Sequence, residues 1–97
     1  MPATFEFAGG ALSVTPSTYD TTIAFEIFNV GDEEGSAEVG CEVDGTYITQ
    51  WTGRLGPNVG DRPTVSLGAF GQGSHTALVY VNPGSGNNDH LSQDFSV

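Results

Sequence analysis

The run His75–Asn82 is the feature that most constrains the fold. Apolar and β-branched side chains leave almost no polar position between residues 78 and 81. A Pro-Gly pair at residues 83 and 84 ends the run, and the chain returns as Leu91–Val97, a pattern that predicts a β-hairpin. Because the first arm is apolar on both sides, we expect both faces to be covered, inside a sheet that packs on another sheet.

Turn residues divide the rest of the chain into further short strands. We expect strands over 21–30, 36–44, 46–52 and 64–68, and one edge strand over 4–8 and 11–15 that changes sheet at Gly9-Gly10. Asp44-Gly45 predicts a two-residue type I′ turn, and Leu55 anchors the loop 53–60. Alternation predicts that these side chains are buried: Phe25, Ile27, Val39, Cys41, Val79 and Val81.

Length and strand spacing set the fold class. No segment of the 97 residues has a helical pattern, and turn signals recur about every 8 to 12 residues. The sequence therefore predicts an all-β fold, a seven-stranded immunoglobulin-like sandwich of two antiparallel sheets. A chain of this size forms one core, so we expect a single immunoglobulin-like domain over residues 1–97.

The charge balance excludes several classes of partner. The chain has 12 acidic residues against two arginines and no lysine, for a formal net charge of -10. Such a surface repels phosphate backbones and anionic lipids, so we expect neither nucleic-acid binding nor membrane insertion. The acidity favours equally a protein adapted to high salt and a small domain that is acidic by chance.

The order and spacing of several short motifs resemble a known family. They are Ile27-Phe-Asn-Val-Gly31, Val43-Asp-Gly45, Leu55, Gly73-Ser-His-Thr76, Val79-Tyr-Val-Asn-Pro83 and Asn87-Asn88. Over residues 20 to 97 this arrangement is similar to the CARDB-like group, the cell-adhesion-related domain of bacteria and archaea. The resemblance implies a sandwich that serves as a spacer, adhesion or surface-display module without catalysis. The chain departs from the family at Asn82-Pro83, where relatives have Asp-Pro.

Candidate chemical sites are weak in this sequence. His75 and His90 could serve as bases, but no nucleophile motif accompanies them, so we expect no enzyme and no cofactor. Asp89 alone does not make a calcium site, and we expect no metal. Cys41 has no partner for an intrachain disulfide and is interpreted as a small core residue.

The acidic residues form a set of their own. The carboxylates Glu33, Glu34, Glu38, Glu42 and Asp44 could suggest a glycosidase pair. We interpret them instead as a solvated face, because an exposed strand offers no burial to separate their pKa values.

Four aromatic side chains are the expected partner-binding residues: Phe5, Phe7, Tyr47 and Trp51. The turn at Asp44-Gly45 directs Tyr47 and Trp51 outward, unless a bulge before Gly53 turns Trp51 back over the core.

The sequence leaves two candidate functions. The first residues have neither the basic nor the apolar segment of a signal peptide, so we expect none, and no apolar run reaches the ~18 residues that a membrane span requires. We therefore expect a non-enzymatic accessory or decoration subunit on a virion capsid, tail or surface layer, located on a virion or extracellular surface. The alternative is an adhesion or carbohydrate-binding module of a secreted or cell-surface protein, with a glycan as its ligand.

Overall fold

The computed structural model describes residues 3–8, 12–82, 84, 86 and 88–97, and all its regular elements are β-strands. It confirms the all-β immunoglobulin-like sandwich. The described part has ten strands rather than the expected seven, because long strands are interrupted and a short one lies in the loop after residue 53. They are β1 Phe5–Phe7, β2 Ser13–Thr15, β3 Thr21–Ala24, β4 Ile27–Asn29, β5 Glu38–Val43, β6 Thr46–Trp51, β7 Gly60–Asp61, β8 Thr64–Gly68, β9 Ser74–Asn82 and β10 His90–Ser96.

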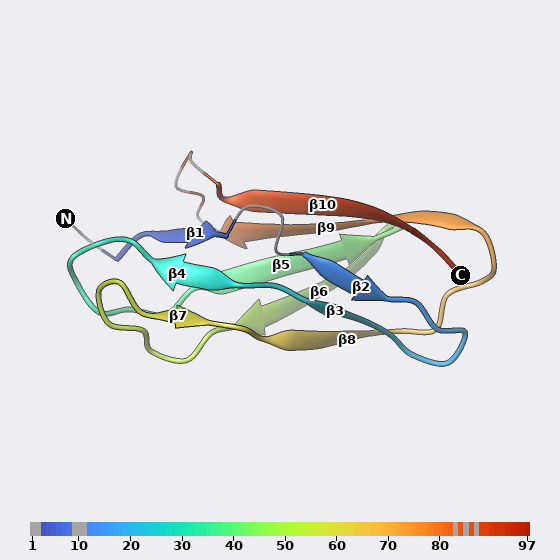
Figure 1. Cartoon of the computed structure of the whole chain (residues 1–97), viewed down its shortest axis with the longest axis horizontal. Coiled ribbons are helices and arrows are strands. Elements are labelled where there is room, and N and C mark those ends of the chain that lie inside the picture. Colours follow the sequence, from blue (N-terminus) through green and yellow to red (C-terminus); the bar gives the residue numbers. More distant parts are fainter. Residues whose placement is uncertain (1–2, 9–11, 83, 85, 87) are drawn as a thin grey trace.

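One layer of the sandwich is a continuous four-stranded antiparallel sheet with the order β10-β9-β5-β6 (Figure 1). The hairpin between β9 and β10 is the one that the apolar run predicts. Asp44 and Gly45 join β5 to β6 with φ angles of 49° and 83°, the two positive values that a type I′ turn requires. The predicted turn is therefore present and fixes the register of β6 on β5.

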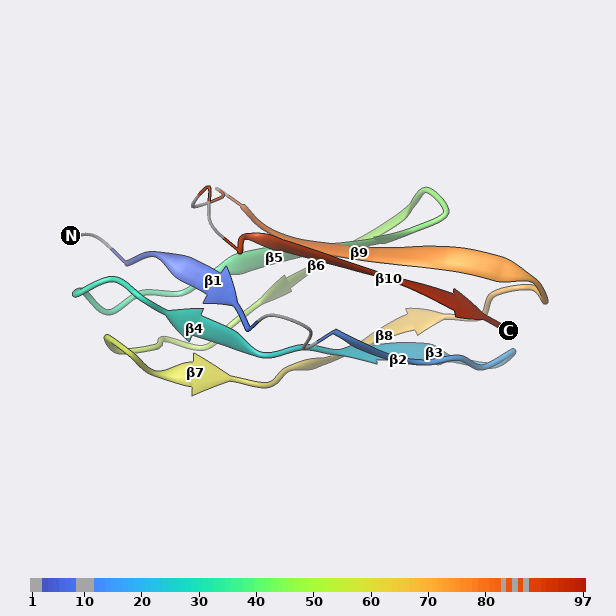
Figure 2. The same ribbon diagram turned by 45° about the horizontal axis from the view of Figure 1, so that its top comes forward.

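The other layer is divided into two three-stranded sheets, β1-β4-β7 and β2-β3-β8, which lie end to end below the first layer in Figure 2. The expected continuous strand 21–30 is wrong in this respect, because β3 and β4 belong to different sheets. At the break between β3 and β4, the Phe25 N–H donates to the carbonyl oxygen of Pro63. Proline has no N–H group, so it cannot donate a second hydrogen bond back to Phe25. β1 and β2 belong to different sheets, as expected, but both sheets lie in this one layer, and Gly9-Gly10 lie outside the described residues.

The core lies between the two layers. Ile23, Phe25 and Ile27 stay on one face across the break and are at most 2% exposed. Leu55 is buried as expected, and Phe7 packs edge-on against Phe25 with ring centroids 5.4 Å apart. All six predicted core residues, Phe25, Ile27, Val39, Cys41, Val79 and Val81, are buried.

The outer face of β9 corrects one expectation. Ala77, Val79 and Val81 face the core, but Leu78 and Tyr80 are only half-buried. The strand is thus covered by a second layer on one face alone. On its other face, Leu78 and Tyr80 are half-buried among side chains of the same sheet. This partial burial explains why apolar residues occupy positions where an alternating strand would have polar ones.

Asn29 is a fully buried polar residue at the end of β4. Its Nδ2 donates to the carbonyls of Glu33 at 2.7 Å and Leu55 at 2.9 Å. Its Oδ1 accepts from the backbone N–H groups of Gly31 at 3.0 Å and Thr4 at 3.2 Å. One side chain therefore ties β1, the turn after β4 and the loop before β7 together.

The molecule is elongated, with principal extents of 44 × 21 × 19 Å. Its strands run along the long axis, with β1 near one end and the end of β10 at the other (Figure 1). Among the described residues, no helix has the length and hydrophobicity needed to cross a membrane.

Candidate functional site

The outer face of the four-stranded sheet exposes two of the predicted partner-binding residues. Tyr47 and Trp51 are 50% and 59% exposed, and both lie on β6. Trp51 points outward, so the alternative in which a bulge turns it over the core is wrong. The two residues are four positions apart, so at about 3.3 Å per residue their Cα atoms lie roughly 13 Å apart.

Tyr80 is a third aromatic residue on this face, and the sequence did not identify it. It lies on β9 directly opposite Gly40 of β5. A Cβ at Gly40 would come within 2.4 Å of Tyr80 Cζ, so the ring lies flat across β5 where a side chain is missing. The ring reaches Tyr47, with centroids 6.4 Å apart and planes tilted by 32°. Gly40 thus allows rings from β9 and β6 to join across the strand between them.

Two carboxylates flank the aromatic rings. Register places Glu42 beside Tyr47 and Glu38 beside Trp51, and both glutamates are half-buried. Desolvation raises the pKa of the Tyr80 phenol, and the hydrogen bond with Tyr47 and the charge of Glu42 act in the same direction. The phenol is therefore a neutral hydrogen-bonding group at physiological pH. We call the five residues Tyr47, Trp51, Tyr80, Glu38 and Glu42 the aromatic face.

Phe5 and Phe7 do not join this face. The structure buries both rings, at 7% and 2% exposure, in the core beneath β1. Neither side chain can contact a partner while the chain is folded, which corrects the expectation that they form a docking surface. Their alternation with Glu6 already indicated one buried face, and the structure shows that both rings lie on it.

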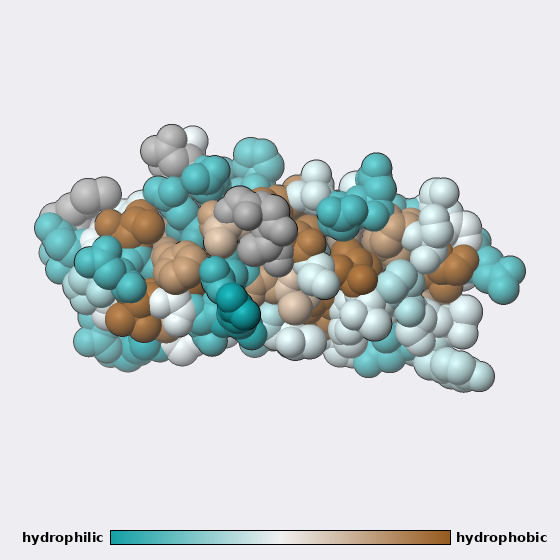
Figure 3. Space-filling model, in the orientation of Figure 1, coloured by the Kyte–Doolittle hydropathy of each residue, from teal (hydrophilic) through white to brown (hydrophobic). Residues whose placement is uncertain are grey.

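Among the described residues, the exposed large apolar side chains outside the aromatic face are Tyr19, Val30 and Val59. Figure 3 shows the side formed by the divided layer, where apolar side chains appear as separate spots between polar ones. The largest exposed aromatic outside the aromatic face is Tyr19, 88% exposed between β2 and β3. Tyr19 lies outside the four-stranded sheet, so Tyr19→Ala provides a control for variants of the aromatic face.

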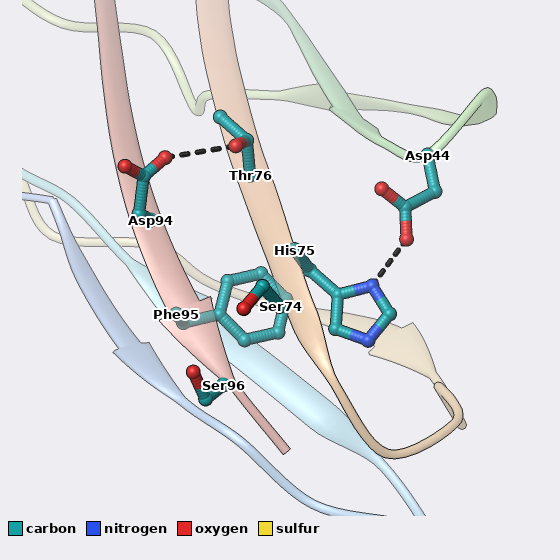
Figure 4. Close-up of a pocket in the computed structure, with 7 residues that line it drawn as sticks. All are labelled: Asp44, Ser74, His75, Thr76, Asp94, Phe95 and Ser96. Atoms are coloured by element: carbon teal, nitrogen blue, oxygen red, sulfur yellow. Dashed lines mark hydrogen bonds and ion pairs between the residues drawn. The ribbon is translucent and has the colours of Figure 1, made fainter.

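A polar pocket of about 400 Å³ lies where β9 begins and β10 ends, at the end of this hairpin that is far from its turn (Figure 4). His75 Nδ1 is paired with the Asp44 carboxylate, and Nε2 lies 2.8 Å from the carbonyl oxygen of Gly71. Both acceptors favour the doubly protonated ring, and the hydrogen bond with Asp44, followed by that with Gly71, raises the pKa of His75. Neither ring nitrogen is free to take a proton from Ser74 or Ser96, which line the same pocket.

The remaining reactive groups have structural roles. Burial raises the pKa of the Cys41 thiol to about 11, so the thiolate is scarce at neutral pH. Asp89 accepts a hydrogen bond from Gly86 N at 2.9 Å and one from His90, and the bond with His90 is the main reason that its pKa is lowered. In the described part of the chain, no three His, Cys, Asp or Glu side chains are grouped to hold a metal ion.

Comparison with known proteins identifies the fold. No protein-family model and no curated protein matches the sequence. Among solved structures, the CARDB domain of a Pyrococcus furiosus protein superposes with a TM-score of 0.68 and 22% identity, over 97% of this chain and 92% of that one. β-Glucosidase 3B from Thermotoga neapolitana, solved with glucose, has a TM-score of 0.76 and 18% identity over 98% of this chain.

These likenesses define the class of structure. The chain has a CARDB-like immunoglobulin fold, as the order of its motifs predicted. It spans 16% of the length of the glucosidase, so the similarity concerns one part of that enzyme. At such identities the comparison establishes the fold, and function has to be argued from the aromatic face.

Proposed function

We propose that this chain is a non-catalytic carbohydrate-binding module that holds its ligand on the aromatic face. The observation that carries the proposal is the exposure of Tyr47 and Trp51 on the outer surface of one sheet, with Tyr80 laid between β9 and β6. Exposed aromatic rings of this kind combine a broad apolar surface with a polar edge. The apolar faces of sugar rings stack on such surfaces.

The carboxylates supply the polar half of the interaction. Glu38 and Glu42 lie beside Trp51 and Tyr47, where they can accept hydrogen bonds from sugar hydroxyl groups. A neutral saccharide is not repelled by a chain of net charge -10, whereas a phosphorylated ligand is. The Cα atoms of Tyr47 and Trp51 lie roughly 13 Å apart, which favours an oligosaccharide over a single sugar ring.

This proposal replaces the virion-decoration role that the sequence favoured. That role depended in part on Phe5 and Phe7, which are buried. The structural neighbours named above are a CARDB domain and a glucosidase solved with glucose, and neither is a virion protein. An adhesion or carbohydrate-binding module fits both the neighbours and the exposed rings.

Trp51 provides a direct test, because it is the single tryptophan of the chain. Titration with a panel of neutral oligosaccharides is expected to shift its fluorescence to shorter wavelength as the ring is desolvated. Calorimetry then gives the affinity of the best ligand. We expect Trp51→Ala to weaken it about tenfold or more, since a tenfold change corresponds to about 1.4 kcal/mol.

Tyr19→Ala is the matched control, since Tyr19 is an exposed aromatic residue far from β6 in the chain. It is expected to bind with wild-type affinity. Equal losses in Trp51→Ala and Tyr19→Ala, or a panel in which no saccharide changes the fluorescence, would refute the proposal.

A further inference from the structure

β6 is an edge strand without the usual protection. The order β10-β9-β5-β6 leaves one side of β6 unpaired within the sheet. Proteins commonly protect such edges with charged residues, proline, bulges or very short strands. β6 has six residues, Thr-Tyr-Ile-Thr-Gln-Trp, with no charge, glycine or proline. The absence of charge along this edge leaves it suited to pairing with a second strand.

The turn determines which backbone groups face the open side. In a two-residue type I′ hairpin, the residues flanking the turn form a hydrogen-bonded pair, here Val43 and Thr46. Hydrogen-bonded pairs then alternate along β6. Thr52 N has the same parity as Thr46 and donates to Ala37 O at 2.9 Å, which agrees with this assignment. The intervening residues Tyr47, Thr49 and Trp51 therefore direct their N–H and C=O groups away from β5.

These three residues are also arranged symmetrically. Tyr47 and Trp51 stand two residues before and two residues after Thr49, on the same face of the sheet. A two-fold axis through Thr49 would pair Thr49 with its own copy and Tyr47 with the partner's Trp51. In all three pairs, the outward N–H and C=O groups of one strand then meet those of the other. If the axis is moved to Ile48 or Gln50, one of the three residues no longer has a partner with outward-facing groups.

We propose that β6 pairs antiparallel with β6 of a second copy of this chain, in the register that places Thr49 opposite its own copy. The register forms two cross-strand aromatic pairs, each between Tyr47 and the partner's Trp51, and such pairs stabilise antiparallel sheets. The Trp51 carbonyl now accepts an exposed bond from the Gln50 side chain at 3.3 Å, which the incoming strand replaces. Pairing joins the two aromatic faces into one surface.

Charge repulsion does not prevent this pairing. In this register Glu42 on β5 would face the partner's Glu38, and three strand spacings, or roughly 14 Å, would separate the two rows. That distance exceeds the Debye length of about 8 Å at physiological ionic strength. Because both copies are strongly acidic, the dimer is expected to become tighter as salt is added.

Sedimentation equilibrium tests the proposal on the whole chain. The wild type is expected to shift from the 10.1 kDa monomer toward twice that mass as its concentration rises, at lower concentration in high salt. Thr49→Pro removes the N–H at the two-fold axis without removing a bond to β5, because that N–H faces outward. We expect it to raise the dimer Kd at least about tenfold, while Thr49→Ala dimerises like the wild type.

Thr49→Glu is a second variant in case proline disturbs the strand. It retains every N–H group and places two carboxylates opposite each other at the axis, so it should also favour the monomer. Wild-type protein that stays monomeric at about 1 mM in about 1 M sodium chloride overturns the proposal. So does a dimer that persists in both Thr49→Pro and Thr49→Glu, because it must form elsewhere.

Cysteine cross-linking tests the register. Thr49→Cys places two thiols opposite each other, at a Cα separation of about 5.5 Å that a disulfide can span. Thr46→Cys is the matched control on the same strand, because its two copies would lie six residues apart, or roughly 20 Å. We expect mild oxidation to link Thr49→Cys chains and to leave Thr46→Cys chains unlinked. The reverse result would overturn the assigned register.

Discussion

Replacing Asn29 with alanine is the sharpest test of how this sandwich is held together. The variant removes the side chain that bonds to Gly31, Leu55, Glu33 and Thr4, and it leaves their backbone groups without that partner. The bonds to Leu55 and Gly31 are buried, and the other two are partly buried, where water can replace the side chain.

The expected magnitude follows from the two buried bonds. Leaving a buried polar group unsatisfied costs about 1 to 3 kcal/mol, so the two together predict a loss of about 2 to 6 kcal/mol in the free energy of unfolding. A domain of this kind has a total stability of about 5 to 15 kcal/mol. Asn29→Ala is therefore expected to lower the urea midpoint substantially and to unfold in part at physiological temperature.

Urea denaturation followed by far-ultraviolet circular dichroism is the appropriate measurement, because Trp51 is exposed in the folded chain and reports unfolding poorly. Asn82→Ala, at an exposed position on the end of β9, is the control and should change stability by about 0.5 kcal/mol or less. Asn29→Asp keeps the shape but replaces the amide donor with an oxygen that faces two carbonyls. Midpoints near that of the control in both Asn29 variants would refute the reasoning.

Four further predictions follow from other sites. Because the pKa of His75 is raised on folding, its contribution to the stability of the folded chain is fully present below about pH 6.5 and is lost as the pH rises through the folded-state pKa. Thermal denaturation should show this pH dependence in the wild type and not in His75→Gln. The buried Cys41 thiol should react with a thiol reagent only on the timescale of unfolding, and rapid labelling of native protein would contradict its placement. Gly40→Ala should displace the Tyr80 ring and weaken saccharide binding while the urea midpoint changes little, since the ring borders solvent; unchanged binding would exclude Tyr80 from the site. The melting temperature should rise with sodium chloride as carboxylate repulsion is screened, and a flat response to about 1 M salt would argue against adaptation to high salt.

Local patterns predicted most of the strands of this fold. Alternation in the segment 36–44 and the turn at Asp44-Gly45 determine β5 and β6 closely, because a period of two and the preference for positive φ are properties of neighbouring residues. The same register argument correctly directed Tyr47 and Trp51 outward. The part of the site carried by one hairpin was therefore predictable.

Features that depend on distant pairing were not predictable. Tyr80 joins the aromatic face only because β9 places it opposite Gly40, and nothing near either residue encodes that register. The interruption at Phe25 is also hidden, because its side chain continues the apolar alternation while its backbone changes partners. Asn29 carried a usable signal, since an asparagine within an otherwise apolar strand has to find hydrogen-bond partners when buried.

The placement of β1 and the end of β10 at opposite ends of the 44 Å axis has a mechanical consequence. A force that pulls the two ends apart acts along the strands, so the hydrogen bonds between β1 and β4 and between β9 and β10 bear the load in shear. Bonds loaded in this way must break together, whereas a force applied across the strands would open them one after another. The β9–β10 ladder joins seven residue pairs from His90↔Tyr80 to Ser96↔Ser74, while β1 and β4 join three. Under tension the chain should therefore yield first at β1, and the β10-β9-β5-β6 sheet should remain intact until higher force.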